Sequence, residues 1–439
     1  MSSTTLTPVG FSRESFESFL AARDEPGWMS DLRRAAWQRF EELPMPSRND
    51  EEWMRTDIRL FRLDKYSTPG DAEQSGQLPP ALLSAGVEVG GRTASLNSRP
   101  VESSLSDELA GQGVLFGSLD ELLPEHGDVL RPYVERRVVD PGYDKFAALH
   151  AAFWSGGSVL FVPKKVRVEQ PLHALAAMTD GGVDFTKTLV VLEQGAEATL
   201  LSETASSDPA AGGFHCGSIE LIVEPEARLR YVNLQNWGGG VWHFAHQKAH
   251  VASRAGLQWT IGALGARLAK VNQHVALTGQ DAEAQVNGVM FTHGKQHLSY
   301  NTHQHHEAAH CRSDLLYKAA LQDQSRTVWR GMIKVDEAAQ RTDAYQRNDN
   351  LMLSQASRAD SIPGLEIEAD DVRCTHGSTA GRVDDNQIFY AMTRGYTRTE
   401  AVRMIVAGFF QQVFDRITIE SVRDALGRAI GDRVRDISE

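Results

Sequence analysis

A short strand-like unit that recurs at near-constant spacing constrains this chain more than any other feature. Each unit has an alanine, any residue, and then usually alanine or leucine, and the first alanines lie 31, 28, 27 and 26 residues apart. Short β-branched runs bounded by Gly and Pro surround the units, which is typical of strands. No helical stripe of ten or more residues interrupts them up to about residue 370. The recurring alanines are Ala196, Ala227, Ala255, Ala282 and Ala308.

A recurring strand unit of this length predicts a β-solenoid, because each coil stacks small and aliphatic side chains on the coil below. Apolar residues also alternate along the predicted strands, as at Ile219, Leu221 and Val223, and again at Leu257 and Trp259. Periodicity alone leaves two alternatives open, a β-sandwich and the chance recurrence of two common residues. We therefore expect a mainly β fold with a stacked-coil core.

Helical patterns stand on both sides of this β region. Apolar residues near the start recur at helical spacing, and Thr397-x-x-Glu400 is a capping box near the end. We predict three parts: a helical and mixed domain at 1–145, a β core at 146–378 and a helical domain at 379–439. The first apolar stripe consists of Phe16, Phe19, Leu20, Trp28, Leu32, Ala36, Phe40 and Leu43.

Composition and charge exclude several classes of protein. The formal net charge is −13, which disfavours non-specific nucleic-acid binding. Cys216, Cys311 and Cys374 lie far apart without a C-x-x-C pair, so neither a disulfide framework nor a self-contained zinc module is expected. The first 20 residues show no secretory signal, and no apolar run approaches the roughly 20 residues that span a bilayer. We expect a soluble, cytoplasmic protein that binds neither membrane nor nucleic acid.

Residues His306 to His310 read H-E-A-A-H, the pattern of a zinc-protease helix. On a helix both imidazoles could reach one zinc, whereas on a strand the same spacing covers roughly 13 Å. The repeat places Ala308 in phase with the earlier strand alanines, so we expect a strand here and His310 as a partly buried residue with a backbone partner. A zinc hydrolase using His306, Glu307 and His310 is the alternative function. The histidine density from His303 to His310 leaves local metal affinity open.

The sequence carries no recognisable nucleotide-binding motif. The stretch "GVMFTHGKQ" at 288–296 has five residues between its glycines and Gln after the Lys, so it is not a P-loop. There is also no G-x-G-x-x-G and no G-x-S-x-G. We expect this chain to bind no nucleotide itself.

Residues 363–395, "PGLEIEADDVRCTHGSTAGRVDDNQIFYAMTRG", resemble the SufB/SufD family of iron–sulfur cluster assembly proteins. Supporting matches are "PSRNDEEWMRTD" at 46–57 and "GMIKVDEAAQRTDAYQRNDNLMLS" at 331–354. SufB-type members carry Glu directly after the matching histidine and further cysteines nearby. Here Gly377 follows His376 and Cys374 stands alone, which favours the SufD branch of the family.

The resemblance implies a right-handed parallel β-helix between helical ends. It implies a pair formed with a SufB-like subunit and bound to two copies of a SufC-like ATPase, docked on the C-terminal helical region. It also implies that Cys374 and His376 lie at the SufB contact, tied to a transient iron–sulfur cluster. A homodimer of the isolated chain is left open.

The chemistry of these two residues is compatible with that role. Cys374 and His376 are two residues apart, so on a strand both face the same side with Cα atoms roughly 6.6 Å apart. Thiolate and imidazole are suitable ligands for iron, but two ligands do not complete a tetrahedral site, so a second chain would supply the rest. The alternative is a buried small cysteine and a structural histidine.

The C-terminal region has more apolar residues than one helix face needs, which suits docking into a partner's groove. The predicted ATPase-docking residues are Arg394, Gly395, Ile405, Phe409, Phe410 and Phe414.

The leading hypothesis is therefore a non-catalytic scaffold subunit for iron–sulfur cluster assembly, in which ATP hydrolysis by the docked ATPase shifts the contact near Cys374 and His376. A carbohydrate-processing β-helix enzyme ranks last, because such enzymes are usually secreted.

Overall fold

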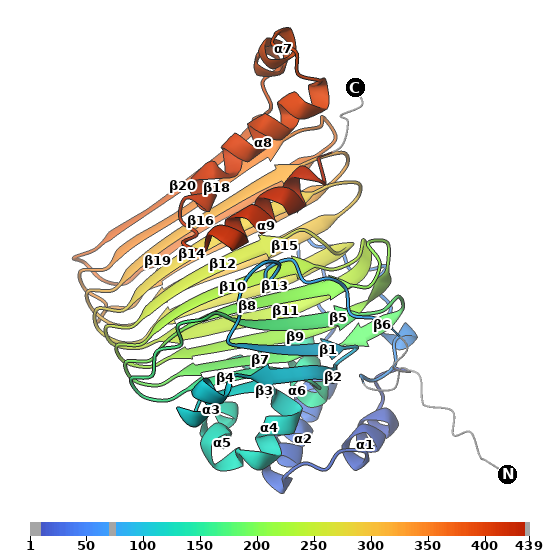
Figure 1. The fold of residues 1–439 in the computed structure, drawn as a ribbon, viewed down its shortest axis with the longest axis vertical. Coiled ribbons are helices and arrows are strands. Elements are labelled where there is room, and N and C mark those ends of the chain that lie inside the picture. Colours follow the sequence, from blue (N-terminus) through green and yellow to red (C-terminus); the bar gives the residue numbers. More distant parts are fainter. Residues whose placement is uncertain (1–9, 70–75, 435–439) are drawn as a thin grey trace, which may run out of the picture.

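The computed structural model describes residues 10–69 and 76–434, and its strands form a parallel β-solenoid of about eight turns between helical regions. Two ten-stranded sheets make the walls of the solenoid, and Figure 1 shows their strands stacked along the long axis of the molecule. Residues 1–9, where the search for a secretory signal began, lie outside the described residues.

The first wall, called sheet 1, runs in the order β2 (Arg99–Leu105), β1 (Gly91–Leu96), β5 (Leu172–Met178), β8 (Glu197–Ser206), β10 (Arg228–Asn236), β12 (Gly256–Ala263), β14 (Glu283–Thr292), β16 (Arg312–Leu321), β18 (Asp343–Met352) and β20 (Arg373–Arg382). The second, sheet 2, runs in the order β19 (Arg358–Ile367), β17 (Arg326–Val335), β15 (His297–His306), β13 (Leu268–Leu277), β11 (Gly240–Val251), β9 (Gly212–Val223), β7 (Lys187–Leu192), β4 (Gly157–Val162) and β3 (Leu115–Ser118), and β6 (Gly182–Asp184) pairs with β9.

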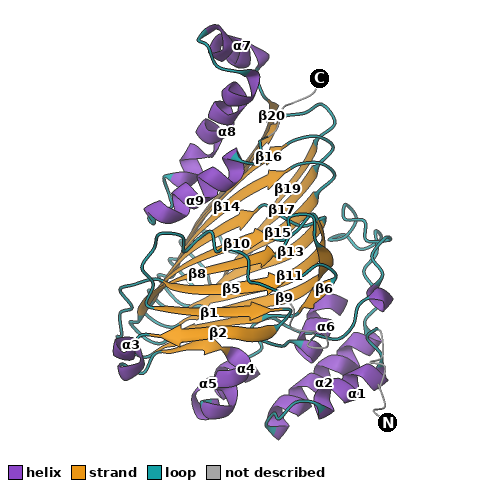
Figure 2. Cartoon of the chain, turned by 45° about the vertical axis from the view of Figure 1, so that its right-hand side comes forward, coloured by secondary structure: helices purple, strands orange, loops and turns teal. Residues whose placement is uncertain are grey.

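The helices lie at the ends of the chain and cover the outside of the sheets (Figure 2). They are α1 (Arg13–Ala21), α2 (Gly27–Glu42), the 3-10 turn η1 (Leu63–Lys65), α3 (Asp107–Gly111), α4 (Leu119–Glu125), α5 (Gly127–Glu135), α6 (Lys145–Phe153), α7 (Asp385–Thr393), α8 (Arg398–Phe414) and α9 (Glu420–Gly431). The predicted domain boundaries between residues 145 and 146 and between residues 378 and 379 stay a prediction.

The predicted alternation of inward side chains is confirmed. Leu221, Val223, Leu257 and Trp259 lie in one continuous core between the two sheets, and Ile219 packs against it. The solenoid is therefore filled by side chains from successive coils, as stacked strands with a two-residue period require.

The recurring alanines follow a turn that each coil repeats. The residue before each alanine has a positive φ, as at Glu226, Arg254 and Asp281. Its backbone N–H donates to a carbonyl of the next coil, for example Arg254 N to Gln280 O at 2.9 Å. The small residue that follows is then fully buried, which explains why alanine recurs there.

The fifth alanine, Ala308, does not belong to this series, so the predicted phase was wrong. Glu283 pairs with Arg312, which places Cys311 and not Ala308 beside Ala282. His310 takes the turn position, with a φ of 61°, and its side chain is exposed. The prediction of a partly buried His310 is therefore corrected, although its N–H does bond a backbone carbonyl, Gln340 O, at 2.9 Å. The coil that runs from Ala282 to Cys311 is therefore longer than the spacing between Ala282 and Ala308 suggested.

The N-terminal helices pack on the outside of sheet 2 through aromatic rings. Phe146 of α6 stacks on Phe244 of β11 at 3.9 Å between centroids, and Phe153 contacts Phe16 and Trp37. The buried face of α2 shares only Ala36 and Phe40 with the predicted stripe, because Trp28 and Leu32 are partly buried. The other buried residues of this helix are Met29, Arg33 and Trp37. A fully buried Arg33, paired with Glu25 at 2.7 Å, also lies on this face.

The C-terminal helices α8 and α9 lie along the outside of sheet 1 (Figure 1). The predicted capping box is confirmed: Thr397 accepts from the N–H of Glu400, and Glu400 accepts from the N–H of Thr397. The apolar face of α8 packs on strand residues such as Val289 and Phe291. Helix α7 projects beyond the last coils.

Candidate functional site at the open end of the solenoid

The C-terminal end of the solenoid is open. In the part of the chain that the structure describes, β20 pairs only with β18 and β19 only with β17. Both strands keep the full ten-residue length of the coils before them, so each presents a row of unpaired backbone groups along its outer edge.

Cys374 and His376 lie on β20 at this end, and their register places them on the interior column of the solenoid. Cys374 pairs with Ala344 and His376 with Gln346, both of which are buried residues of β18. Because parallel strands in register point equivalent side chains the same way, Cys374 and His376 face inward on the last coil. Among residues 10–69 and 76–434 no further coil stacks on β20, so Cys374 is half-buried and His376 is exposed.

Strand β19 likewise carries side chains that have an interior register but are exposed. Leu365 and Ile367 pair with Ile333 and Val335, which are fully buried. Leu365 and Ile367 are nevertheless 37% and 40% exposed. The open end therefore presents a cross-section of the solenoid interior in which apolar side chains from one sheet stand opposite a cysteine and a histidine from the other.

The surroundings of Cys374 disfavour the thiolate form. Burial against the small apolar cluster around Ala344 and Val335 raises its pKa, and the nearby Asp343 carboxylate adds to the rise. Metal ligation requires a thiolate, so a cation or a partner that excludes Asp343 would be needed to release the proton.

The part of the chain that is described contains no group of three or more His, Cys, Asp or Glu side chains placed to hold a metal ion. Cys374 and His376 together offer two ligands, one thiolate and one imidazole.

The H-E-x-x-H residues do not form a helix. His306 is the last residue of β15 and points inward, where its Nε2 lies 2.8 Å from Ser313 Oγ. Glu307 lies beyond the strand and pairs with His305, while His310 stands in the exposed turn. Because His306 and His310 belong to a strand end and a turn, the geometry of a zinc-protease site is absent from these residues.

The remaining histidines of this stretch stack on the outer face of sheet 2. The rings of His274 and His303 lie 4.5 Å apart at 19°, and His305 continues the stack. Desolvation lowers the pKa of His303 to about 4, with His305 adding to the effect. Face-to-face imidazoles direct their ring nitrogens side by side instead of toward one point, which is why the dense histidines do not make a chelating set.

The structure separates the predicted docking residues into two groups. Phe410 and Phe414 are buried against sheet 1, and Ile405 and Phe409 are partly buried in the same cluster. Arg394 and Gly395 are exposed at the end of α7, where the Arg394 guanidinium lies 5.0 Å from the ring of Tyr390.

Exposed apolar side chains of this region were missed by the sequence analysis. They cluster on and after α7, where Phe389 is 69% exposed and Tyr390 61%. Phe389, Tyr390 and Met392 belong to the 363–395 stretch that resembles the SufB/SufD family, but the sequence did not show which side chains were free. The set is Phe389, Tyr390, Met392, Tyr396 and Met404.

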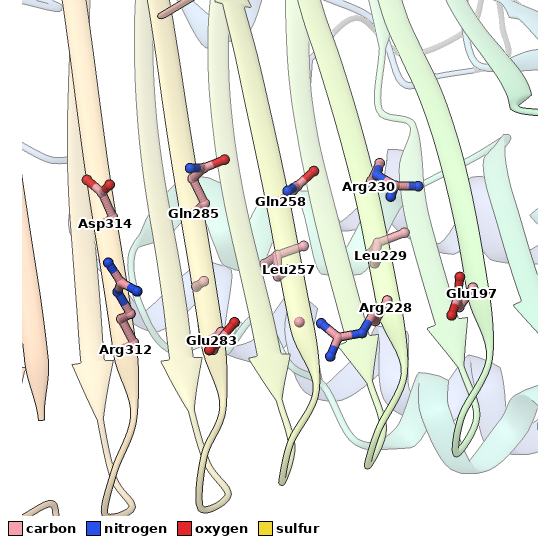
Figure 3. A pocket seen from close by; sticks show the side chains of 12 residues that line it. Glu197, Arg228, Leu229, Arg230, Leu257, Gln258, Glu283, Gln285, Arg312 and Asp314 are labelled. Carbon is pink, nitrogen blue, oxygen red and sulfur yellow. The ribbon is translucent and has the colours of Figure 1, made fainter. Parts of the chain in front are cut away.

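A groove on the outer face of sheet 1 is a second feature that the sequence did not reveal. Figure 3 shows its charged side chains in rows across β8 to β16, at the beginning of each strand. Arg228, Glu283 and Arg312 alternate in charge along one row, and Asp314 pairs with Arg416 beyond α8. The alternation is typical of a solvated sheet face, because neighbouring strands place opposite charges beside each other.

Comparison with known proteins agrees with this architecture. The family "SUF system FeS cluster assembly, SufBD core domain" matches residues 175–409, and "SufBD protein N-terminal region" matches residues 17–174. An iron–sulfur cluster assembly SufBD family protein of Staphylococcus haemolyticus is 26% identical over 411 residues, covering 91% of this chain and 88% of the relative. The iron–sulfur cluster assembly protein SufB of Bacillus subtilis is 26% identical over 427 residues, covering 94% and 90%.

All three cysteines are free, and no helix among the described residues is long and apolar enough to cross a bilayer. The core match spans more than half of the chain and coincides with the stacked coils and the open end. The chain therefore belongs to the SufBD family and is a component of the SUF iron–sulfur cluster assembly system.

Proposed function

We propose that this chain is a SufD-type scaffold subunit, which pairs with a SufB-like subunit through its open end and acts without catalytic chemistry of its own. The open cross-section carries the proposal. It exposes Leu365 and Ile367, whose equivalents on the preceding strand are fully buried. These side chains lie beside two unpaired strand edges. A partner that ends in a similar open coil would cover both.

The SufD assignment is supported by Gly377 after His376 and by a lone Cys374 on β20. A SufB-like subunit with more cysteines would then provide most of the ligands for iron or a nascent cluster. Cys374 and His376 would provide the remainder across the interface, and the cluster is cargo that leaves the site. Free thiols suit a reducing, cytoplasmic setting.

We further propose that a SufC-like ATPase docks on α7 and the start of α8, one copy on each subunit of the pair. The exposed rings of Phe389 and Tyr390 are candidates to fill a groove on that partner. ATP-driven approach of the two ATPases would pull on the helical regions and reshape the contact near β20. Helix α8 packs directly on β14 and β16, so force on it is transmitted to the coils.

Substitution of Ile367 by Lys tests the pairing surface. The charge would have to be buried on assembly, so we expect co-purification with a tagged SufB-like subunit to fall at least tenfold while the isolated chain still folds. Val101→Lys is the matched control, because Val101 is 52% exposed on β2 at the opposite end. Equal loss in both variants, or no loss in Ile367→Lys, would contradict pairing through the open end.

Substitution of His376 by Ala tests the ligand role. We expect the purified complex to stay intact and iron–sulfur enzyme activity in cells to fall, because His376 is exposed and contributes little to folding. Ser378→Ala, at the next inward position of β20, should leave both unchanged. Normal cluster delivery in the His376→Ala strain would remove His376 from the proposal while leaving the scaffold role intact.

A test of the ATPase contact follows from the exposed rings. Phe389→Ser combined with Tyr390→Ser should abolish capture of the ATPase without affecting the pair with the SufB-like subunit. Retained ATPase capture by the double variant would place the docking surface elsewhere.

A further inference from the structure

A pocket of about 700 Å³ lies on the side of the solenoid, away from the open end. Four successive turns line it, each of them connecting a strand of sheet 1 to the next strand of sheet 2. They contribute Pro209, Gly239, Arg267 and Lys295, and Arg433 closes the pocket from the residues that follow α9.

Three cations of this pocket have no carboxylate partner. Arg267, Lys295 and Arg433 line it, and within the described residues none of them forms an ion pair. The Arg267 guanidinium instead lies 5.1 Å from the ring centroid of Trp242. Such a concentration of unpaired positive charge is unexpected in a chain whose net charge is −13.

The neighbouring carboxylates of the described residues accept from backbone N–H groups of the turns and form no ion pair with the three cations, although Gly294, the partner of Asp323, itself lines the pocket. Asp323 accepts from the N–H of Gly294 at 2.7 Å, and Asp208 accepts from the N–H of Ala210 at 2.6 Å. Asp432 precedes Arg433 but lies beyond ion-pair distance of it, and burial lowers the pKa of the guanidinium. The charge of Arg433 is therefore only weakly compensated by the protein.

The turn that carries Lys295 is held rigidly. Gln296 Oε1 accepts from the N–H of His293 at 3.0 Å, and Gln296 Nε2 donates to Ala266 O at 3.0 Å in the adjacent turn. This turn is part of the "GVMFTHGKQ" stretch that fails as a P-loop. Lys295 is thus fixed at its backbone beside the turn of Arg267.

Arg433 is positioned as well. Its Nη1 donates to Ala429 O at 2.7 Å, and its Nη2 donates to Asn236 Oδ1 on the pocket wall. Next to Asn236, the indole N–H of Trp237 has no partner within the described residues although Trp237 is only 2% exposed. A buried donor without a partner commonly marks a place where a ligand or water belongs.

We propose that this pocket binds a small phosphate-bearing anion. Three cations that approach from two turns and from the chain after α9 suit a group with several acceptor oxygens, and guanidinium groups bind phosphate through paired N–H donors. The volume exceeds that of a single phosphate, so the ligand carries a second phosphate or an organic body. The site is separate from the open end and does not depend on the proposed scaffold role.

Calorimetric titration of the full chain with inorganic phosphate, pyrophosphate and ribose 5-phosphate tests this proposal. We expect saturable binding of pyrophosphate or ribose 5-phosphate that is tighter than that of orthophosphate and weakens with added salt. Tighter binding of pyrophosphate would show that the pocket takes a second phosphate, and tighter binding of ribose 5-phosphate would show that it takes an organic group. Absence of saturable binding for all three at millimolar concentration overturns the proposal.

Variants locate the binding. Lys295→Gln and Arg267→Gln should each weaken binding about tenfold, the effect of losing one charge-assisted contact. Lys164→Gln is the matched control, since it removes the same charge from an exposed turn outside the pocket. Equal weakening by Lys164→Gln and Lys295→Gln would show that the anion responds to overall charge, and would refute a site here. Binding needs no partner subunit, so failure of the pairing experiments leaves this result independent.

Discussion

The two ends of the solenoid face the same physical problem and solve it differently. At the N-terminal end the last strands reverse direction: β2 is antiparallel to β1, and β3 is antiparallel to β4. These strands are short, β2 carries Pro100 and Glu102, and α4 packs against β3 and β4. Such features blunt a sheet edge. At the C-terminal end the coils stop at full length, and the inward-facing Leu365 and Ile367 of β19 are left exposed.

The difference supports the proposed pairing through the C-terminal end. An edge that is reversed, shortened and covered is stable alone, whereas an uncovered one is a template for another chain. The inward residues also differ: Leu160, Leu172 and Leu200 fill the N-terminal coils, while Gln346, Asn348 and Asn350 of β18 lie inside the coil that β20 covers. The open end thus contributes less to the stability of the isolated chain.

The largest expected effect is at the N-terminal end. Phe153→Ala removes a fully buried ring that contacts Phe11, Phe16, Phe19 and Trp37. We expect a loss of about 3–5 kcal/mol in the free energy of unfolding, from lost burial and the cavity left behind. Urea denaturation followed by circular dichroism measures it. A loss below about 1 kcal/mol would contradict the claim that the N-terminal end contributes more to stability than the open end.

An intermediate effect is expected from His306, in the interior of the C-terminal half. Burial lowers its pKa to about 3, with His305 adding to the effect, while the unfolded chain binds that proton near pH 6.5. The unfolded state therefore binds more protons between these values, and stability is lost as the pH falls from about 6.5 toward 3. At pH 5 this His costs about 2 kcal/mol.

The variant His306→Asn should remove that dependence. Unfolding measured between pH 7 and pH 4.5 should have a slope smaller by about one proton, and Asn still offers a polar group to Ser313. An unaltered slope in His306→Asn would show that His306 is protonated in the folded protein.

A smaller effect is expected at the start of α8. Thr397→Ala removes the side-chain acceptor of the capping box and should lower the free energy of unfolding by about 1 kcal/mol. Glu400→Gln keeps an acceptor for the Thr397 N–H and should cost less. If the two variants lose equal stability, the charge of Glu400 near the helix N-terminus matters more than the hydrogen bonds.

The smallest effect is expected at the open end. Ile367→Ala in the isolated chain should cost less than about 1 kcal/mol, because its side chain is already 40% exposed. Denaturation of the same variant in the assembled pair should show a larger loss, since the partner would bury that side chain. A cost equal to that of Phe153→Ala in the isolated chain would mean that the open end is already closed in solution.

Much of the architecture could be predicted from local pattern. The inward alternation at Leu221, Leu257 and Trp259 and the capping box at Thr397 follow from periodicity and cap chemistry, and the structure confirms them. The error at Ala308 arose because alanine is common. The letter pattern matched Ala308, in the turn, instead of Cys311 three residues later, which is the true equivalent of Ala282. Only the pairing of Glu283 with Arg312 fixes the phase.

The sequence by itself determined that the chain winds into stacked strands between helices, because alternation and turn chemistry act over a few residues. The tertiary structure decided which residues the stack leaves uncovered. Cys374 and Ile367 have the register of interior residues and become accessible because, in the described part of the chain, no coil stacks on β19 and β20. Phe410 was expected to dock a partner because it is apolar, yet sheet 1 covers it. Exposure depends on what lies above a side chain in space, and no local pattern contains that information.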